Sequence, residues 1–490
     1  MKRRVDGILV TLLLVAALAR FPGLGERSLW FDEALSGLIA QLSTSEVLTN
    51  AAGSSHPPGY YLLLHVWHPV GESEFALRFP SVWFSLLAVA IVARLARDFL
   101  GRRTARLAAL GMATSPFQVY YAQEARMYGL AIALSAGVLW ASLQVATRDD
   151  RTGWWLYVTL AAAGLYVHYY VGLMIAVLHL WLILYGPRTR KQLPSLLAAD
   201  AVVALAFLPQ LMQFRAEAGE FLGEPRWRVA PSPLEPLRSL YYLLFGHVLP
   251  LKLVFAGLFL VLALLAVGLA SHRGQLRDIE WLLLTVVLVP VFLVLGMSLL
   301  ITPVYVERSF AVLTPALILL LARYTGGRPR RSPAPYLGIG LVSLMILGVV
   351  LYHVRADPAK PPLREAISTV AKEARSTDKI LHLQDASYVP ALYYEPVRAG
   401  ELLNAGQRLW LAPEIYRLLG GRTVQPVDLT WSARTWVISM PGYLDAVQSE
   451  PLERLGVDED PVQTWSWDIV GPGGRKYESI RVRLYTPSSR

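Results

Sequence analysis

Residues 5–21 read VDGILVTLLLVAALARF, and residues 29–37 read LWFDEALSG. An apolar run long enough to enter a bilayer is thus followed closely by two adjacent carboxylates, Asp32 and Glu33. The run comes after the basic start MKRR, as the core of a signal peptide would, but no small-residue cleavage site follows it cleanly. We therefore predict a retained first membrane helix that leads into an acidic loop.

The whole chain is apolar in composition. Of its 490 residues, 54% are hydrophobic and 17% are charged, which lies outside the range of soluble proteins. The mean hydropathy is +0.42. The formal net charge of +10 arises mostly in short loops between apolar runs, so it indicates membrane orientation and not a nucleic-acid partner. Because cysteine is absent, disulfides, thiolate nucleophiles and Cys-ligated metals are excluded.

Basic loops give the apolar segments a direction. By the positive-inside rule we place the amino terminus and the basic loops in the cytoplasm; these loops are 94–106, 148–151, 186–192, 271–278 and 323–333. The other loops, including a long first loop at about residues 21–77, then lie outside. The pattern predicts a polytopic α-helical membrane domain over residues 1–353 with about eleven transmembrane helices.

The composition changes abruptly after the last apolar run, near Tyr352. Residues 354–490 are charged, contain prolines and have the length of an ordinary soluble domain. LREAISTVAKEA has helical spacing, whereas KILHLQ, RTWVISM and YESIRVRLYT read as strands, the last as an edge or antiparallel strand. We predict a small extracytoplasmic α/β domain.

The first outer loop carries the first group of candidate site residues. Asp32 and Glu33 precede the segment SSHPPGYY, whose two prolines prevent a helix and hold the backbone extended. This stiff segment would present His56 and Tyr60. The alternative is that the acids cap the helix expected at ALSGLIAQLS, and for Glu33 a capping or supporting role is favoured.

The second group lies in YYAQEARMYG, residues 120–129, between two hydrophobic helices. Gln123, Glu124 and Arg126 fall close to the membrane depth at which an unpaired charge is costly, so they are functional candidates together with Tyr128. The alternative is a local pairing of Glu124 with Arg126, with the tyrosines forming an interfacial aromatic belt.

The third and fourth groups are YVHYYVG, with His168, and TPVYVERSF, with Tyr305, Glu307 and Arg308. A histidine among tyrosines is weak evidence alone, because interfacial residues of both types are common. A proline breaks the span before Arg308, and an arginine beside a broken helix can grip a phosphate with its planar donors. An arginine whose charged end only reaches up to the membrane interface explains Arg308 nearly as well.

All four groups fall on the face opposite the basic loops, so one outward pocket would hold a carboxylate base, an arginine and aromatic side chains. That set suits transfer of a sugar from a polyprenyl phosphate, since a carboxylate deprotonates the acceptor hydroxyl while arginine or a metal offsets charge on the leaving phosphate. The chain has no Walker-type loop and no GxGxxG after a strand, which agrees with chemistry that uses no nucleotide.

The motifs WFDEA, HPPGYY, YYAQEARMYGL and VYVERSF, in that order, resemble those of the polytopic GT-C glycosyltransferases. The sequence is most similar to bacterial relatives of the protein O-mannosyltransferases and aminoarabinose transferases, glycosyltransferase family 39. The resemblance covers about residues 1–350. It implies an inverting transfer to a glycan, lipid or protein acceptor at the bacterial plasma membrane.

The resemblance also implies site roles. Asp32 corresponds to the general base, with Glu33 as neighbour or alternative, and some relatives use a divalent metal, for which Asp32, Glu124 and His56 are candidate ligands. We expect donor binding by Arg126, Arg308, Tyr305 and Tyr128, and the rest of the pocket from His56, Tyr60, Gln123, Glu124, His168 and Glu307.

Two other classes of function remain as alternatives. A lipid-linked glycan transporter or flippase would also have an outward pocket and buried charges, although no internal repeat is visible and the carboxylates gather on one side. A non-catalytic subunit for glycan assembly would keep the aromatics but lose the base, whereas Asp32 is present here.

Overall fold

A computed structural model describes residues 6–50, 56–148, 151–185, 193–222, 230–271, 278–326, 332–354, 360–404, 411, 413–425, 434–440, 461–470 and 476–486. The chain forms two compact units, which we describe separately. Unit 1 comprises Met1–Pro22, Ser55–Tyr60 and Arg78–Val354, and unit 2 comprises Gly23–Ser54, Tyr61–Leu77 and Arg355–Arg490. Most of the first outer loop therefore groups with the C-terminal segment, whereas the sequence had led us to expect it in the membrane domain.

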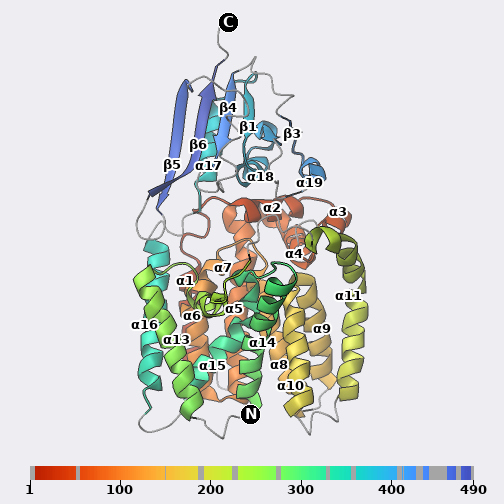
Figure 1. The fold of residues 1–490 in the computed structure, drawn as a ribbon, viewed down its shortest axis with the longest axis vertical. Coiled ribbons are helices and arrows are strands. Elements are labelled where there is room, and N and C mark those ends of the chain that lie inside the picture. The colour runs from red at the N-terminus through yellow and green to blue at the C-terminus, as the bar shows by residue number, and fades with distance from the viewer. Residues whose placement is uncertain are drawn as a thin grey trace. The chain divides into compact units, whose positions relative to one another are not determined.

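Unit 1 is helical (Figure 1). Its helices are α1 (Gly7–Arg20), α5 (Glu74–Phe99, shared with unit 2), α6 (Arg102–Thr114), α7 (Pro116–Ala122), α8 (Tyr128–Arg148), α9 (Arg151–Val167), α10 (Tyr170–Tyr185), α11 (Leu193–Leu222), α12 (Glu235–Phe245), α13 (Leu251–Ser271), α14 (Asp278–Leu300), η4 (Glu307–Leu313), α15 (Thr314–Gly326) and α16 (Ala334–Val354). The chain is thus a multi-pass membrane protein of mainly helical structure, as the sequence predicts.

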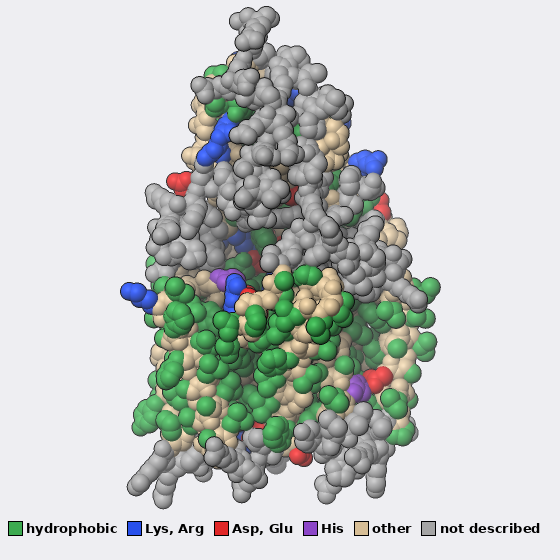
Figure 2. Space-filling model, in the orientation of Figure 1, with side chains coloured by type: hydrophobic (Ala, Val, Ile, Leu, Met, Phe, Trp, Pro, Cys, Tyr) green, Lys and Arg blue, Asp and Glu red, His purple; other side chains and the backbone are tan. Residues whose placement is uncertain are grey.

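Among the described residues, seven helical segments are long and apolar enough to cross a membrane, and three more apolar helices are shorter. The sequence had suggested about eleven spans. Hydrophobic side chains cover much of the visible face of the helical unit (Figure 2). On α13, Leu251, Phe255 and Phe259 are 71%, 66% and 66% exposed and recur at every fourth position. Such a stripe is stable only against lipid or protein.

Buried hydrogen bonds fix the end of α6, which leads into the candidate site. The Arg20 guanidinium donates to the carbonyls of Met112 and Ala113 at 2.9 and 3.2 Å, and its Nε donates to Ser85 at 2.8 Å. A cation at a helix carboxyl end satisfies free carbonyls and the helix dipole. Ser115, whose hydroxyl donates to the Leu244 carbonyl at 2.7 Å, then begins α7.

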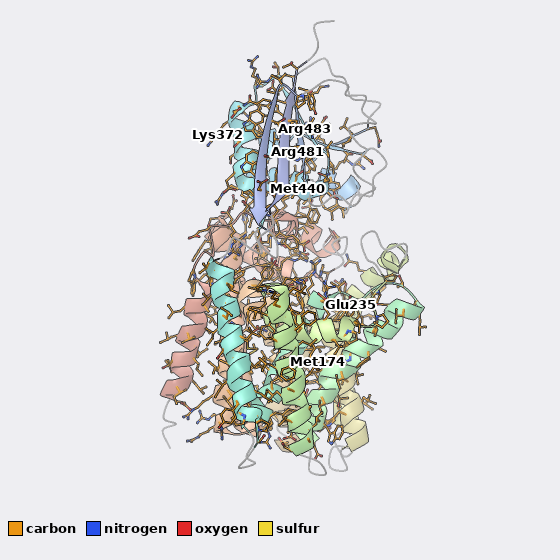
Figure 3. The ribbon with its side chains drawn as sticks, turned by 60° about the vertical axis from the view of Figure 1, so that its left-hand side comes forward. Met174, Glu235, Lys372, Met440, Arg481 and Arg483 are labelled. Carbon is orange, nitrogen blue, oxygen red and sulfur yellow. The ribbon has the colours of Figure 1, made fainter. Side chains whose placement is uncertain are left out.

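Unit 2 contains a six-stranded sheet of order β3-β2-β1-β4-β6-β5. The strands are β1 (Lys379–His382), β2 (Glu401–Leu403), β3 (Thr423–Val424), β4 (Thr435–Ser439), β5 (Gln463–Val470) and β6 (Lys476–Tyr485). Strand β1 runs parallel to β2 and β4, and β6 runs antiparallel to both β4 and β5. The predicted strands are confirmed, and β6, which carries Arg481 and Arg483 (Figure 3), is the antiparallel strand and not an edge.

The helices of unit 2 come from both ends of the chain: α2 (Phe31–Ala40), α3 (Thr44–Asn50), α4 (Gly59–Trp67, mostly in this unit), η2 (His68–Val70), α17 (Leu363–Glu373), α18 (Asp385–Tyr394), η5 (Pro396–Arg398) and α19 (Pro413–Leu418). Helix α2 packs against α18. A Cβ at Gly37 would lie 2.5 Å from the Tyr393 ring, so this close approach requires glycine. The packing explains why the acidic loop belongs to this unit.

Candidate active site

The connection between α7 and α8 buries two charged side chains of unit 1. Glu124 and Arg126 are 1% and 2% exposed, in the turn that the sequence predicts between two helices. The Arg126 carbonyl accepts from the Ser81 hydroxyl at 3.1 Å, and Ser81 also pairs with the Tyr60 hydroxyl at 3.2 Å. Tyr60 therefore helps to fix the backbone of the turn through α5.

Two tyrosines of this motif, Tyr121 and Tyr128, are buried and do not belong to a lipid-facing belt. Tyr121 and Tyr128 are 4% and 2% exposed, with ring centroids 4.5 Å apart. The Tyr121 hydroxyl lies 2.5 Å from that of Tyr242 on α12. Tyr120 hydrogen-bonds to the Glu124 carboxylate, and burial together with that carboxylate raises the pKa of Tyr120 well above its usual value. Tyr120 thus remains a donor to Glu124.

His168 lies at the centre of this aromatic group, in the turn between α9 and α10. Its ring centroid is 6.0 Å from that of Tyr128 and 6.2 Å from that of His56. Its Nδ1 accepts from the Tyr170 backbone N–H at 3.2 Å, so in the neutral ring Nε2 carries the proton. Within the described part of the chain, that buried Nε2 has no hydrogen-bond partner.

The surroundings of His168 are cationic. Burial, and then the guanidinium groups of Arg126 and Arg308, lower the pKa of His168 to about 3. The structure thus brings together His168, Arg126 and Arg308, which come from three of the predicted motifs. A buried N–H donor that lies beside two guanidinium groups is a feature of an anion-binding site.

Arg308 belongs to a segment held in place by α12. As predicted from Pro303, α14 ends before this segment, at Leu300. Tyr305 pairs through its hydroxyl with Ser239 at 2.7 Å, and Glu307 pairs with Arg238 Nε at 2.8 Å. Arg238 also reaches Glu235, labelled in Figure 3, at 3.5 Å. These contacts restrict the backbone on both sides of Val306.

His56 precedes a close approach between two helices. Helix α4 begins at Gly59, directly after Pro57 and Pro58, so Tyr60 lies in a helix and not in the extended segment that the sequence predicts. A Cβ at Gly59 would lie 2.5 Å from the Tyr166 carbonyl oxygen, so only glycine permits this packing against α9. The packing accounts for the ring contact between His56 and the histidine that follows α9.

Gln123 has a structural environment. Its Nε2 donates to the carbonyls of Arg20 and Pro22 at 2.9 and 2.6 Å, and its Oε1 accepts from the Tyr352 hydroxyl at 2.9 Å. The amide thus joins the end of α1 to α16. With both amide donors and an acceptor lone pair occupied, Gln123 supports the turn instead of offering a donor to a ligand.

Asp32 and Glu33 belong to unit 2, in the first turn of α2. Glu33 is fully buried, and its Oε2 accepts from Lys360 Nζ at 2.6 Å. Asp32 is partly exposed, and its backbone carbonyl accepts from the Ser36 hydroxyl at 2.8 Å. The two adjacent acids therefore differ in burial, and Glu33 is held by a buried lysine.

Comparisons with known proteins agree with the motifs. The family model described as dolichyl-phosphate-mannose-protein mannosyltransferase matches residues 55–212. A search of curated proteins finds no match. Among solved structures, ArnT from Cupriavidus metallidurans bound to undecaprenyl phosphate is 13% identical, covers 99% of this chain and 99% of its own, and gives a TM-score of 0.65.

Two further structures extend the comparison. The oligosaccharyltransferase AglB from Archaeoglobus fulgidus, in complex with an inhibitory peptide and a dolichol-phosphate, is 10% identical, with a TM-score of 0.53 and coverage of 96% of this chain and 74% of its own. The arabinofuranosyltransferase AftD from Mycobacteria is 15% identical, with a TM-score of 0.50 and coverage of 98% and 41%. The chain has the GT-C glycosyltransferase fold. This confirms the resemblance that the sequence motifs indicated.

The candidate metal ligands do not form a ready-made site within the described residues. The described residues contain no group of three or more His, Cys, Asp or Glu side chains placed to hold a metal ion. Of the ligands expected from sequence, His56 contacts the His168 ring and Glu124 accepts from Tyr120. A divalent metal held by Asp32, Glu124 and His56 therefore stays a prediction from the sequence, and we derive no chemical step through one.

Sequence reasoning missed several partners of the site residues. Lys360, Arg238 and Ser81 each contact a residue that the motifs had identified. None stands in a recognisable motif, because each contact joins segments distant in sequence. The buried Tyr121 was present in a quoted motif, and the repeated tyrosines there were the only signal for it.

Proposed function

We propose that this GT-C protein is a glycosyltransferase that moves a sugar from a polyprenyl-phosphate-linked donor to an acceptor hydroxyl, with inversion at the anomeric carbon. The observation that carries this proposal is the buried, neutral His168 beside Arg126 and Arg308. An unpaired N–H donor and two guanidinium groups form a site for a phosphate. In this reaction the phosphate is the leaving group.

Charge stabilisation at the phosphate is the first part of the mechanism. As the bond between the anomeric carbon and the phosphate oxygen breaks, negative charge grows on polyprenyl phosphate. The two arginines offset that charge, and Nε2–H of His168 donates to a phosphate oxygen. Because His168 is neutral, it donates this hydrogen bond without adding a third positive charge to the two guanidinium groups of the site.

Deprotonation of the acceptor is the second part. In the proposal Asp32 takes the proton of the acceptor hydroxyl, whose oxygen forms the new bond to the anomeric carbon as polyprenyl phosphate departs. Glu33 is the alternative base and adjoins Asp32 in sequence. Its ion pair with Lys360 favours a supporting role for it, because a paired buried carboxylate is a weaker base.

The remaining residues complete the pocket in this proposal. The rings of His56 and Tyr128 lie against the ring of His168. Glu124, which is hydrogen-bonded to Tyr120, holds the turn that carries Arg126. Tyr60 and Gln123 support that turn, and Tyr305 and Glu307 support Arg308. The structures of ArnT bound to undecaprenyl phosphate and of AglB in complex with dolichol-phosphate support a lipid-linked donor by analogy of fold.

We also propose that the protein lies in the bacterial plasma membrane with residues 355–490 outside. The basic loops of the sequence support this orientation. The acceptor would then be a glycan, lipid or protein at the outer surface, where polyprenyl-linked sugars are exposed.

The test is a donor panel. Purified protein is incubated with polyprenyl phosphates carrying different hexoses or pentoses, and release of polyprenyl phosphate is measured, with Asp32→Asn as the control. We expect one donor to be consumed by the wild type and spared by the variant. Movement of donor lipid across vesicles without release would favour the flippase, and binding with neither activity would favour a non-catalytic subunit.

A further inference from the structure

Helices α6, α15 and α16 of unit 1 enclose an apolar cavity of about 190 Å³. Each helix contributes a stripe of its lining: Leu107 and Leu110 from α6, Leu321 and Thr325 from α15, and Leu341 and Met345 from α16. The hydroxyl of Thr325 donates to the Leu321 carbonyl at 2.9 Å, so it needs no hydrogen-bond acceptor from a ligand. The cavity therefore suits a hydrocarbon chain.

The cavity is elongated and open at its side. On α15 the lining extends from Ile318 to Thr325, which corresponds to about 10 Å along a helix axis. Ile339, another lining residue, is 64% exposed, and Ser343 beside it is also exposed. Because these positions lie on membrane-spanning helices, the surroundings of the opening are lipid and not water.

One end of the cavity carries a positive charge. Arg103 precedes the lining residue Leu107 by four positions, which places the two on one face of α6. A Cβ placed on Gly326, the last residue of α15, would lie 3.4 Å from Leu107 Cδ1 and 3.8 Å from Arg103 Cδ. The arginine stem therefore runs past the end of the lining.

Arg103 is available to an outside anion. It is exposed, and the described residues form no ion pair with it. By contrast, Arg106 on the same helix is paired with Asp6 at 3.1 Å. An exposed guanidinium at a membrane surface attracts anionic lipid headgroups. The charge and the apolar cavity thus form two parts of one recognition surface.

We propose that this surface binds one anionic phospholipid, with an acyl chain in the cavity and the headgroup phosphate on Arg103. The donor phosphate proposed above is a different site, because Arg308 precedes α15 whereas Arg103 lies beside its last residue. Helix α15 has 13 residues, or about 20 Å of helix axis. The lipid therefore comes from the leaflet in which the amino end of α6 lies. Its binding does not depend on the transferase proposal.

The test is lipid titration of the full-length, delipidated protein by native mass spectrometry. Phosphatidylglycerol and phosphatidylcholine with identical acyl chains are compared, since only the headgroup charge differs. We expect the wild type to bind phosphatidylglycerol about fivefold more tightly. Arg103→Gln should remove this preference, and the matched exposed variant Arg102→Gln, about 100° around the helix, should retain it.

A second pair of variants tests the cavity. Ser343→Trp places a large ring over the lined opening and should weaken binding of both lipids. Leu205→Trp, at an exposed position of α11 outside the lining, should not. Equal wild-type affinity for the two phospholipids would overturn the proposal, as would equal losses in the two arginine variants. Displacement of phosphatidylglycerol by undecaprenyl phosphate at equal concentration would also overturn it, in favour of an isoprenoid occupant.

Discussion

Lys360 and Glu33 form a buried ion pair 327 residues apart in sequence, with Nζ and Oε2 separated by 2.6 Å. Their side chains are 6% and 0% exposed. The pair fixes the first turn of α2, which also carries Asp32, to the segment that follows the last membrane helix. The lysine therefore contributes both to the stability of unit 2 and to the electrostatic surroundings of the proposed base.

Lys360→Met should destabilise unit 2 by about 3–5 kcal/mol, because it leaves a buried carboxylate uncompensated. The measurement is the free energy of unfolding by denaturant, followed through tryptophan fluorescence. Adding Glu33→Leu to Lys360→Met should recover most of the loss, since an apolar pair replaces the lone charge. Glu72→Gln, which breaks a partly exposed pair with His68, is the control and should cost less than about 1 kcal/mol. A loss as small as in the control would contradict the role assigned to Lys360.

Asp32→Asn should leave the unfolding free energy and donor affinity near wild-type values and lower turnover by about a hundredfold or more. The amide keeps the shape of the side chain but cannot accept the acceptor proton. Single-turnover release of polyprenyl phosphate is the measurement. A near-normal rate would remove Asp32 from the mechanism, and a normal rate in Asp32→Asn with loss in Glu33→Gln would transfer the role to Glu33.

Arg308→Ala and His168→Phe should each weaken donor binding by about tenfold, since each removes a hydrogen bond to a charged phosphate. Equilibrium binding of a non-hydrolysable polyprenyl phosphate analogue measures the effect. Arg94→Ala is the matched control, because that arginine pairs with Asp98 one helical turn away on α5. Unchanged donor affinity in Arg308→Ala, with the control also unchanged, would count against the phosphate site.

Local patterns in the sequence predicted local structure well. The periodicity of residues 363–373 and the alternation of residues 476–485 are properties of one helix and one strand, and both elements are found. The same holds for the turn at His168. In each case neighbouring residues alone determine the element.

Partnerships between distant segments could not be read from the sequence. Glu33 was expected to cap or support α2, but nothing near it indicates Lys360. Likewise, Glu307 and Arg238 stand in different helical segments, and no spacing rule relates them. Burial of Tyr121 and Tyr128 was missed because interfacial and buried tyrosines have the same local pattern, and only packing against Tyr242 separates them.

The orientation of the chain can be tested by protease accessibility. If residues 355–490 lie outside, a protease added to intact spheroplasts should cleave within them and leave the membrane helices protected. Cleavage products are followed with a tag at each terminus. Protection of the C-terminal segment in intact spheroplasts, combined with cleavage after permeabilisation, would reverse the proposed orientation.

Acid should destabilise unit 2 through His382. This side chain is fully buried in β1, with Nδ1 3.0 Å from the Ser387 hydroxyl, and burial lowers the pKa of His382 to about 3. An unfolded histidine has a pKa near 6.5, so between about pH 3 and 6.5 the unfolded chain binds one more proton than the folded chain. The free energy of unfolding should therefore be insensitive to this group above about pH 7 and fall by about 1.4 kcal/mol per pH unit below 6.5.

His382→Gln removes the titrating group and should reduce the acid slope by that amount, even if it lowers stability at all pH values. The comparison uses the difference in slope between the two full-length proteins. The contribution of His168 in unit 1, whose pKa is similarly depressed, is the same in both and cancels. Denaturant unfolding at pH 5, 6, 7 and 8, monitored by fluorescence of the stacked Trp436 and Trp465, reports on the sheet. Identical slopes in wild type and variant would show that His382 does not account for acid sensitivity.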